Sequence, residues 1–157
     1  MSETYSKDPQ TERSLRHSLR DGVAYAVMTG AGEIYFSAYA IFLKASTAQI
    51  SFLAAVPSLL GSFAQLFSAW LARRSGRRKE IILAGVLGQA LTWLSIIWLP
   101  FFFPAQGATI LIVAVVLYYA AGNLAAPLWN SLMGDLVPEH KRGRFFAQRT
   151  RSMSLMS

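Results

Sequence analysis

The chain has no cysteine and only two histidines, His17 and His140, among its 157 residues. Without cysteine it forms neither a disulfide nor a thiolate metal site, and the two histidines, which lie in separate basic segments, do not make a metal site by themselves. A histidine pair, a cysteine nucleophile and a Ser-His-acid set are also missing, so no enzyme class is favoured. We therefore expect no cofactor, no metal ion and no enzymatic activity.

Charged residues are scarce as well: they make up 15% of the chain, against 54% hydrophobic residues. This balance is unusual for a soluble domain and typical of a membrane protein. The 15 Lys and Arg residues outnumber the eight Asp and Glu residues. All of the basic residues except Lys44 fall in three blocks, at residues 7–20, 73–79 and 141–151.

Four apolar runs separate these blocks, at residues 22–43, 50–71, 81–103 and 108–133. About 20 helical residues cross the roughly 30 Å of hydrocarbon in a bilayer, so each run is long enough to span it. Strand-like alternation is absent, and a backbone in lipid must satisfy its own hydrogen bonds, so each run should be helical along its whole length. The sequence predicts an all-α membrane protein with four transmembrane helices, a polar tail over residues 1–20, and a basic segment over residues 135–157 that leads into a fifth helix.

The basic blocks also predict the orientation, because Lys and Arg are enriched in cytoplasmic segments near the ends of spans. Fourteen of the basic residues flank the runs on one side, and only Lys44 lies on the other. We therefore expect a cytoplasmic N-terminus. Topology and attraction to anionic lipid headgroups account for every basic block, so no nucleic-acid partner is expected.

Glu33 lies near the middle of the first run. A carboxylate at the centre of a membrane helix costs about 2.5–3.5 kcal/mol on insertion scales, so such residues usually face a cavity or a partner and mark ion or substrate paths. Removal from water favours the neutral form of a carboxyl group, which makes Glu33 a candidate proton carrier. The alternative is an ion pair. No Lys or Arg lies inside the four runs, so its partner would come from elsewhere in a longer chain or from the substrate.

Polar side chains cluster on single faces of the first and fourth runs, because residues three and four apart share a helix face. Gln65 and Gln89 on the second and third runs are interpreted as interhelical hydrogen-bonding groups, which typically contribute about 0.6 kcal/mol. Asn123 suits either role. The residues predicted to line a cavity or couple to protons are Glu33, Thr29, Ser37, Tyr119, Asn123 and Asn130.

Two loops carry a family resemblance. Residues 69–79 read AWLARRSGRRK, which resembles the loop motif Gly-x-x-x-Asp-Arg-x-Gly-Arg-Arg/Lys of the major facilitator superfamily. Residues 134–144 read GDLVPEHKRGR, which resembles that superfamily's acidic, Pro-Glu and Arg-Gly-Arg segment before its fifth helix. Arg73 stands where the family has its aspartate and Ala69 where it has its glycine, so the match is incomplete in the first motif.

The resemblance implies a secondary active transporter with twelve spans in two halves, inverted three-helix repeats, and a central substrate cavity lined by the first and fourth helices. The chain is then expected to be the N-terminal part of such a transporter, which works with the remainder of that chain and a small-molecule substrate. Glu33 adds protons and the basic blocks add anionic lipids as expected partners, in a plasma membrane of the bacterial inner type. A four-helix scaffold that binds a partner through small-residue helix faces is the alternative. The residues implied in gating are Arg74, Gly76, Arg77, Arg78, Asp135, Glu139, Arg142 and Arg144.

Overall fold

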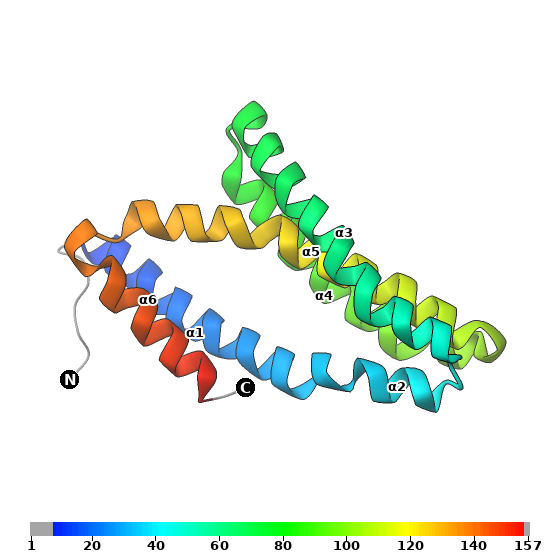
Figure 1. Ribbon diagram of the computed structural model, residues 1–157. Helices are drawn as coiled ribbons and strands as arrows, with labels where there is room; N and C mark the ends of the chain where they lie inside the picture. Colours follow the sequence, from blue (N-terminus) through cyan, green and yellow to red (C-terminus); the bar gives the residue numbers. More distant parts are fainter. Residues whose placement is uncertain (1–7, 156–157) are drawn as a thin grey trace. The chain divides into compact units, whose positions relative to one another are not determined.

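The computed structural model describes residues 8–155, apart from the side chains of residues 99 and 100. Over this range the chain is almost entirely helical and contains no strand, which confirms the predicted all-α class (Figure 1). The elements in chain order are α1 (Pro9–Ala31), η1 (Glu33–Tyr35), α2 (Phe36–Phe42), α3 (Thr47–Ser75), α4 (Arg78–Phe102), η2 (Pro104–Gln106), α5 (Gly107–Leu136) and α6 (Glu139–Ser154).

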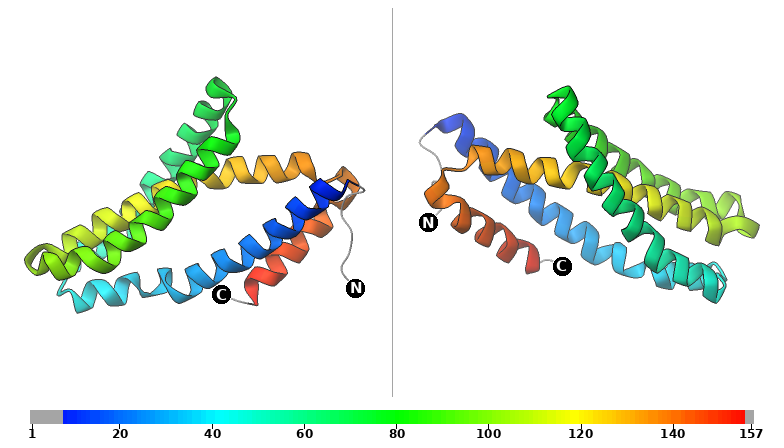
Figure 2. Two further views of the ribbon diagram at one scale, coloured as in Figure 1. Left: turned by 180° about the vertical axis from the view of Figure 1, so that it is seen from behind. Right: turned by 45° about the horizontal axis from the view of Figure 1, so that its top comes forward.

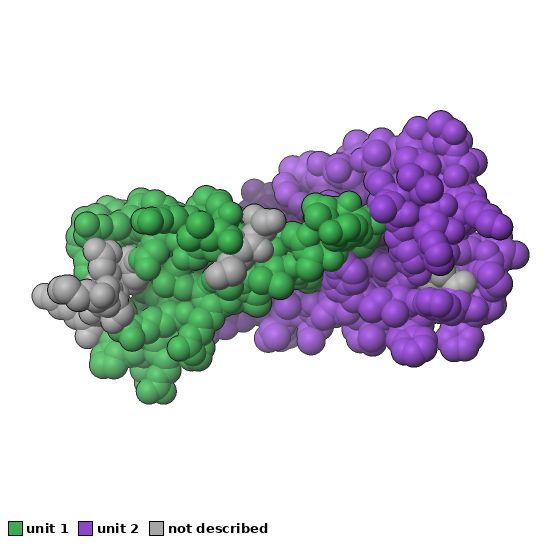
Figure 3. All heavy atoms as spheres, turned by 90° about the horizontal axis from the view of Figure 1, so that it is seen from below, with its two compact units in different colours: residues 1–36, 131–157 green, residues 37–130 purple. Residues whose placement is uncertain are grey.

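Three stretches of the described residues are long and apolar enough to cross a membrane: Thr47–Ser75, Arg78–Trp98 and Pro104–Leu136. They correspond to α3, α4 and to η2 with α5, and α1 is a fourth long helix. The protein is therefore a multi-pass membrane protein. The chain divides into two compact units, residues 1–36 with 131–157 and residues 37–130, which Figure 3 colours separately.

The helix α1 begins well before the first apolar run. Its N-cap is Asp8, whose carboxylate accepts hydrogen bonds from the backbone N–H of Thr11 at 3.0 Å and from the Thr11 hydroxyl at 2.6 Å. These bonds lower the pKa of Asp8, with the side-chain bond having the larger effect. Pro9 follows at the first helical position, where its missing N–H costs nothing. Residues 9–20, expected to be a polar tail, are thus helical.

The first apolar run is not one continuous helix, and the expectation of unbroken helix over residues 22–43 was wrong. The helix α1 ends at Ala31, Gly32 adopts φ −125° and ψ −61°, and Glu33–Tyr35 form a single 3₁₀ turn before α2. The Gly32 N–H bonds to the carbonyl of Thr29. Glycine is a poor helix former, by about 1 kcal/mol relative to alanine, and Gly30 and Gly32 together make this the weakest point of the run.

The second unit is organised by α3, α4 and the first part of α5. A capping box opens α3: the Ser46 hydroxyl accepts from the Gln49 backbone N–H at 3.3 Å, and the Gln49 side chain accepts from the Ser46 N–H at 2.9 Å. At its other end α3 stops at Gly76, which has φ +67° and bonds to the Ala72 carbonyl at 3.0 Å. A left-handed residue of this kind is a common helix terminator. The α3–α4 link therefore needs only Gly76 and Arg77.

In the first unit, α6 lies beside α1 and runs in the same direction (Figures 1 and 2). The residues that α1 buries are spaced three and four apart along one face, and they are Leu15, Ser18, Gly22 and Ala26. Helix α6 buries Phe145 completely. Because three of the four α1 residues are small, the backbones of the two helices can approach closely.

Candidate functional site

Glu33 lies at the interruption between α1 and α2, as the first residue of the 3₁₀ turn. Its side chain is half-buried. One turn earlier the Thr29 hydroxyl donates to the Ala26 carbonyl at 3.0 Å. Glu33 is also close enough to Tyr25 to act on it electrostatically. The carboxyl group is thus placed where the regular helix stops, with polar groups on the preceding two turns of α1.

A second polar group, which we call the polar junction, consists of Gly61, Gln65 and Asn123 and links α3 to α5. The Gln65 amide donates to Oδ1 of Asn123, and Nδ2 of Asn123 donates to the Tyr119 carbonyl at 2.8 Å. Gly61 makes room for this amide, because a Cβ atom there would lie 2.6 Å from Asn123 Nδ2. The side chain of Asn123 is therefore hydrogen-bonded within the interface between α3 and α5.

Gln89 on α4 is packed in a similar way against α5. It is only 8% exposed, and a Cβ atom on Gly122 would lie 2.6 Å from its Nε2 atom. About one turn before Gln89 on α4, a Cβ atom on Gly85 would lie 2.7 Å from the Ala121 carbonyl oxygen. The contact between α4 and α5 thus depends on glycine on both helices.

We expect the polar junction to contribute a measurable coupling energy. In a double-mutant cycle of Gln65→Ala and Asn123→Ala, the coupling should be about 0.6 kcal/mol, the usual size for a hydrogen bond between membrane helices. Reversible unfolding of the purified protein in mixed micelles measures it. The matched control is Asn130→Ala, since Asn130 is exposed on the same helix and should show no coupling to Gln65. Additive effects of the Gln65 and Asn123 changes would contradict this role.

A third cluster, missed by the sequence analysis, lies between α1 and α6 and includes Asp21, Gly22, Tyr25 and Arg149. A Cβ atom on Gly22 would lie 3.0 Å from Nε and 3.3 Å from Cζ of Arg149, so the guanidinium covers the glycine. Burial lowers the pKa of Arg149, against the opposing effects of Asp21 and Tyr25. The signals available in the sequence were a glycine directly after an aspartate, Asp21-Gly22, and an arginine one helical turn after a phenylalanine, Phe145 and Arg149.

The sequence profile of the Major Facilitator Superfamily matches residues 22–155. The chain belongs to the major facilitator superfamily. This is a family of membrane transporters for small molecules, and the members of the family are not generally enzymes. The general activity of the chain is therefore transport. Comparison with curated proteins and with solved structures returned no match to this chain.

The superfamily's first loop motif lies at the α3–α4 link. Arg77, in the link, forms an ion pair at 3.4 Å with Glu80 in the first turn of α4, and the Arg74 guanidinium lies 5.7 Å from the ring centroid of Trp70. Arg78 is the first residue of α4. Exposed pairs of this kind contribute at most about 1 kcal/mol. Arg74 and Arg77 thus contact side chains that are close to them in the sequence.

The second motif spans the end of α5 and the start of α6. Arg142 pairs with Glu139 at 3.6 Å and donates from Nε to the Val137 carbonyl at 3.1 Å. Asp135 lies in the last turn of α5, and Arg144 is exposed on α6. The Arg142–Glu139 ion pair lies within α6, and the hydrogen bond to the Val137 carbonyl joins α6 to the short link that precedes it.

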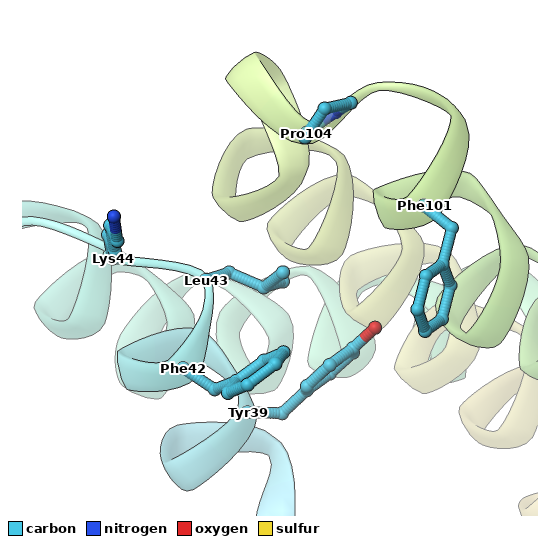
Figure 4. A pocket seen from close by; sticks show the side chains of 6 residues that line it. All are labelled: Tyr39, Phe42, Leu43, Lys44, Phe101 and Pro104. Carbon is cyan, nitrogen blue, oxygen red and sulfur yellow. The ribbon is translucent and has the colours of Figure 1, made fainter.

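A cavity of about 380 Å³ lies in the second unit, where the α2–α3 loop meets the end of α4 (Figure 4). Its lining is mainly apolar and aromatic. Figure 4 shows the rings of Tyr39 and Phe42 together and the Lys44 side chain pointing away from them. The Tyr39 hydroxyl donates to the Ile96 carbonyl at 3.4 Å. None of the residues that the sequence predicts to line a transport cavity lines this one. Its lining residues are Tyr39, Phe42, Leu43, Lys44, Phe101 and Pro104.

Proposed function

We propose that this superfamily member is a secondary active transporter of a small solute, that it couples transport to protons, and that Glu33 carries the proton. The observation that supports this most is the position of Glu33 at a break in its helix. Irregular backbone at membrane depth is tolerated where it is buried in protein or lines a water-filled cavity. In secondary transporters, interrupted apolar segments are the best sequence pointer to the binding site.

The physical chemistry of the break fits this role. A carboxyl group that leaves water favours its neutral form, so binding and release of a proton can follow the exposure of Glu33 to either side of the membrane. The 3₁₀ turn leaves backbone carbonyl and N–H groups outside regular helical bonding, where they can bind water or solute. We propose that the other polar residues of the same cavity are Thr29, Ser37, Tyr119, Asn123 and Asn130.

The loops take a conformational role in this proposal. The pairs Arg77–Glu80 and Arg142–Glu139 are exposed and local, so they can exchange partners at low cost when the protein changes conformation. We place them on the cytoplasmic side of a plasma membrane, with the N-terminus, and in contact with anionic lipids. Further transmembrane helices of the transporter complete the cavity. The residues of this gating region are Arg74, Gly76, Arg77, Arg78, Asp135, Glu139, Arg142 and Arg144.

Solute-driven proton flux tests the proposal. The full protein is reconstituted into liposomes that enclose a pH-sensitive dye, and sugars, organic anions, peptides and lipophilic drugs are added outside one at a time. A transporter coupled to protons shifts the internal pH with at least one solute, and a protonophore abolishes the shift. A four-helix scaffold shows no shift with any solute, but it associates with a partner protein.

A further inference from the structure

No Lys or Arg lies inside the four apolar runs, but the structure places Arg149 of α6 directly against Gly22 of α1. Arg149 lies one helical turn after the fully buried Phe145. Its Cγ, Nε and Cζ atoms would all lie within 3.4 Å of a Cβ atom on Gly22. The stem and guanidinium of Arg149 therefore lie flat on the α1 backbone, at a place where any side chain would compete with them.

Two polar residues of α1 flank the glycine on which Arg149 lies. Asp21 directly precedes Gly22, and Tyr25 follows it by three residues, so both lie within one turn of Gly22. Both act electrostatically on Arg149. Tyr25 in turn is acted on by Glu33 as well as by Arg149. Along the chain, Tyr25 lies between Gly22, on which Arg149 packs, and Glu33.

We propose that Arg149 is a positioning residue of the transport cycle: seated over Gly22 beside Asp21, it fixes the N-terminal half of α1 against α6 and so sets the position of Tyr25 and Glu33. The proposal rests on the transport function proposed above. A long cationic side chain suits this task, because its stem packs on apolar surface and its planar head binds a carboxylate. Because Arg149 lies so close to the α1 backbone, the residue opposite it must be a glycine.

The test is a double-mutant cycle of Asp21→Asn and Arg149→Gln in the full protein, read out in two ways. The first readout is the thermal unfolding midpoint in detergent, which needs no solute. The second is the maximal solute-driven proton flux and the half-saturating concentration of the responding solute. Arg151→Gln is the matched control, since it removes the same charge from an exposed position on the same helix.

We expect Arg149→Gln to lower the maximal flux by about tenfold, with little change in the half-saturating concentration, because a positioning residue affects the turnover and makes no contact with the solute. Asp21→Asn should have a similar effect, and the double variant should be no worse than either single one. Arg149→Lys should restore part of the flux. Arg151→Gln should leave both readouts at the wild-type level.

The outcomes separate this inference from the proposed function. Non-additive unfolding midpoints in a protein without any solute-driven flux would keep the energetic coupling of Asp21 to Arg149 but overturn the positioning role together with the transport proposal. Normal flux in Arg149→Gln, with additive midpoints, would overturn the role of Arg149 and leave the transport function standing. A fall in midpoint and flux that Arg149→Lys does not relieve would show that the residue serves packing alone, which also overturns the proposal.

Discussion

Replacing Glu33 by glutamine should abolish proton coupling without preventing membrane insertion. Glutamine keeps the shape and hydrogen-bonding capacity of the neutral acid but binds no proton. Solute-driven proton flux should therefore fall by about 100-fold, the scale seen when a positioned proton-transfer group is lost. Liposomes that contain the purified variant and an internal pH-sensitive dye measure the flux.

Exchange of labelled for unlabelled solute is a second measurement on the same variant. Because glutamine mimics the protonated form, steps that occur with the proton bound should persist, so exchange of labelled for unlabelled solute should continue. Glu33→Asp, which keeps the carboxyl group, should retain part of the coupled flux and is the matched control. Normal coupled transport with normal pH dependence in Glu33→Gln would remove Glu33 from the proton path.

Gly85→Ala should destabilise the contact between α4 and α5. The new Cβ atom would lie 2.7 Å from the Ala121 carbonyl oxygen and 3.0 Å from the Ala125 Cβ atom, and the backbone of α5 cannot move aside as a flexible side chain would. Overpacking of this kind typically costs about 1–3 kcal/mol. Reversible unfolding in mixed micelles should show the loss.

The same helix supplies the control for this change. A Cβ atom on Gly88 would meet only the Ala121 Cβ atom, at an ordinary contact distance of 3.5 Å. Gly88→Ala should therefore be neutral or stabilising by up to about 1 kcal/mol, because alanine is the better helix former. Equal stability of the two variants would show that α4 and α5 do not approach as closely as the structure has them.

Hydrophobic run length predicted the three apolar helices well. The runs at 50–71, 81–103 and 108–133 lie almost wholly within α3, α4 and α5, since roughly 20 apolar residues in lipid have few options other than a helix. The same criterion missed the break at Gly32, because glycine counts as neutral in hydropathy while it weakens the helix locally. Helix α1 begins at Asp8-Pro9, which is a helix-capping signal. The polar composition of residues 1–20 predicted a tail there instead of a helix.

The candidate site was predictable only in part. Glu33 was visible because a carboxyl group in an apolar run is conspicuous, and the tie between Gln65 and Asn123 followed the expectation that polar side chains in lipid find each other. The cluster around Arg149 was not predictable, because it depends on α6 lying beside α1, and no local pattern specifies which helices become neighbours. The reason for a glycine at position 22 became clear only from the structure, where Arg149 lies against it.

The most direct test of the account is the water accessibility of the Glu33 region from both sides of the membrane. Residues 1–157 contain no cysteine, so Ser37→Cys gives this part of the protein one thiol close to the break, and Leu87→Cys on the exposed surface of α4 serves as the control, with the unchanged protein as the background. A membrane-impermeant maleimide is applied to right-side-out and to inside-out vesicles, since a thiol reacts as a thiolate and needs water. Alternating access predicts that Ser37→Cys reacts in both preparations and Leu87→Cys in neither. Reaction of Ser37→Cys in neither preparation, or from one side alone, would contradict a transport cavity at Glu33.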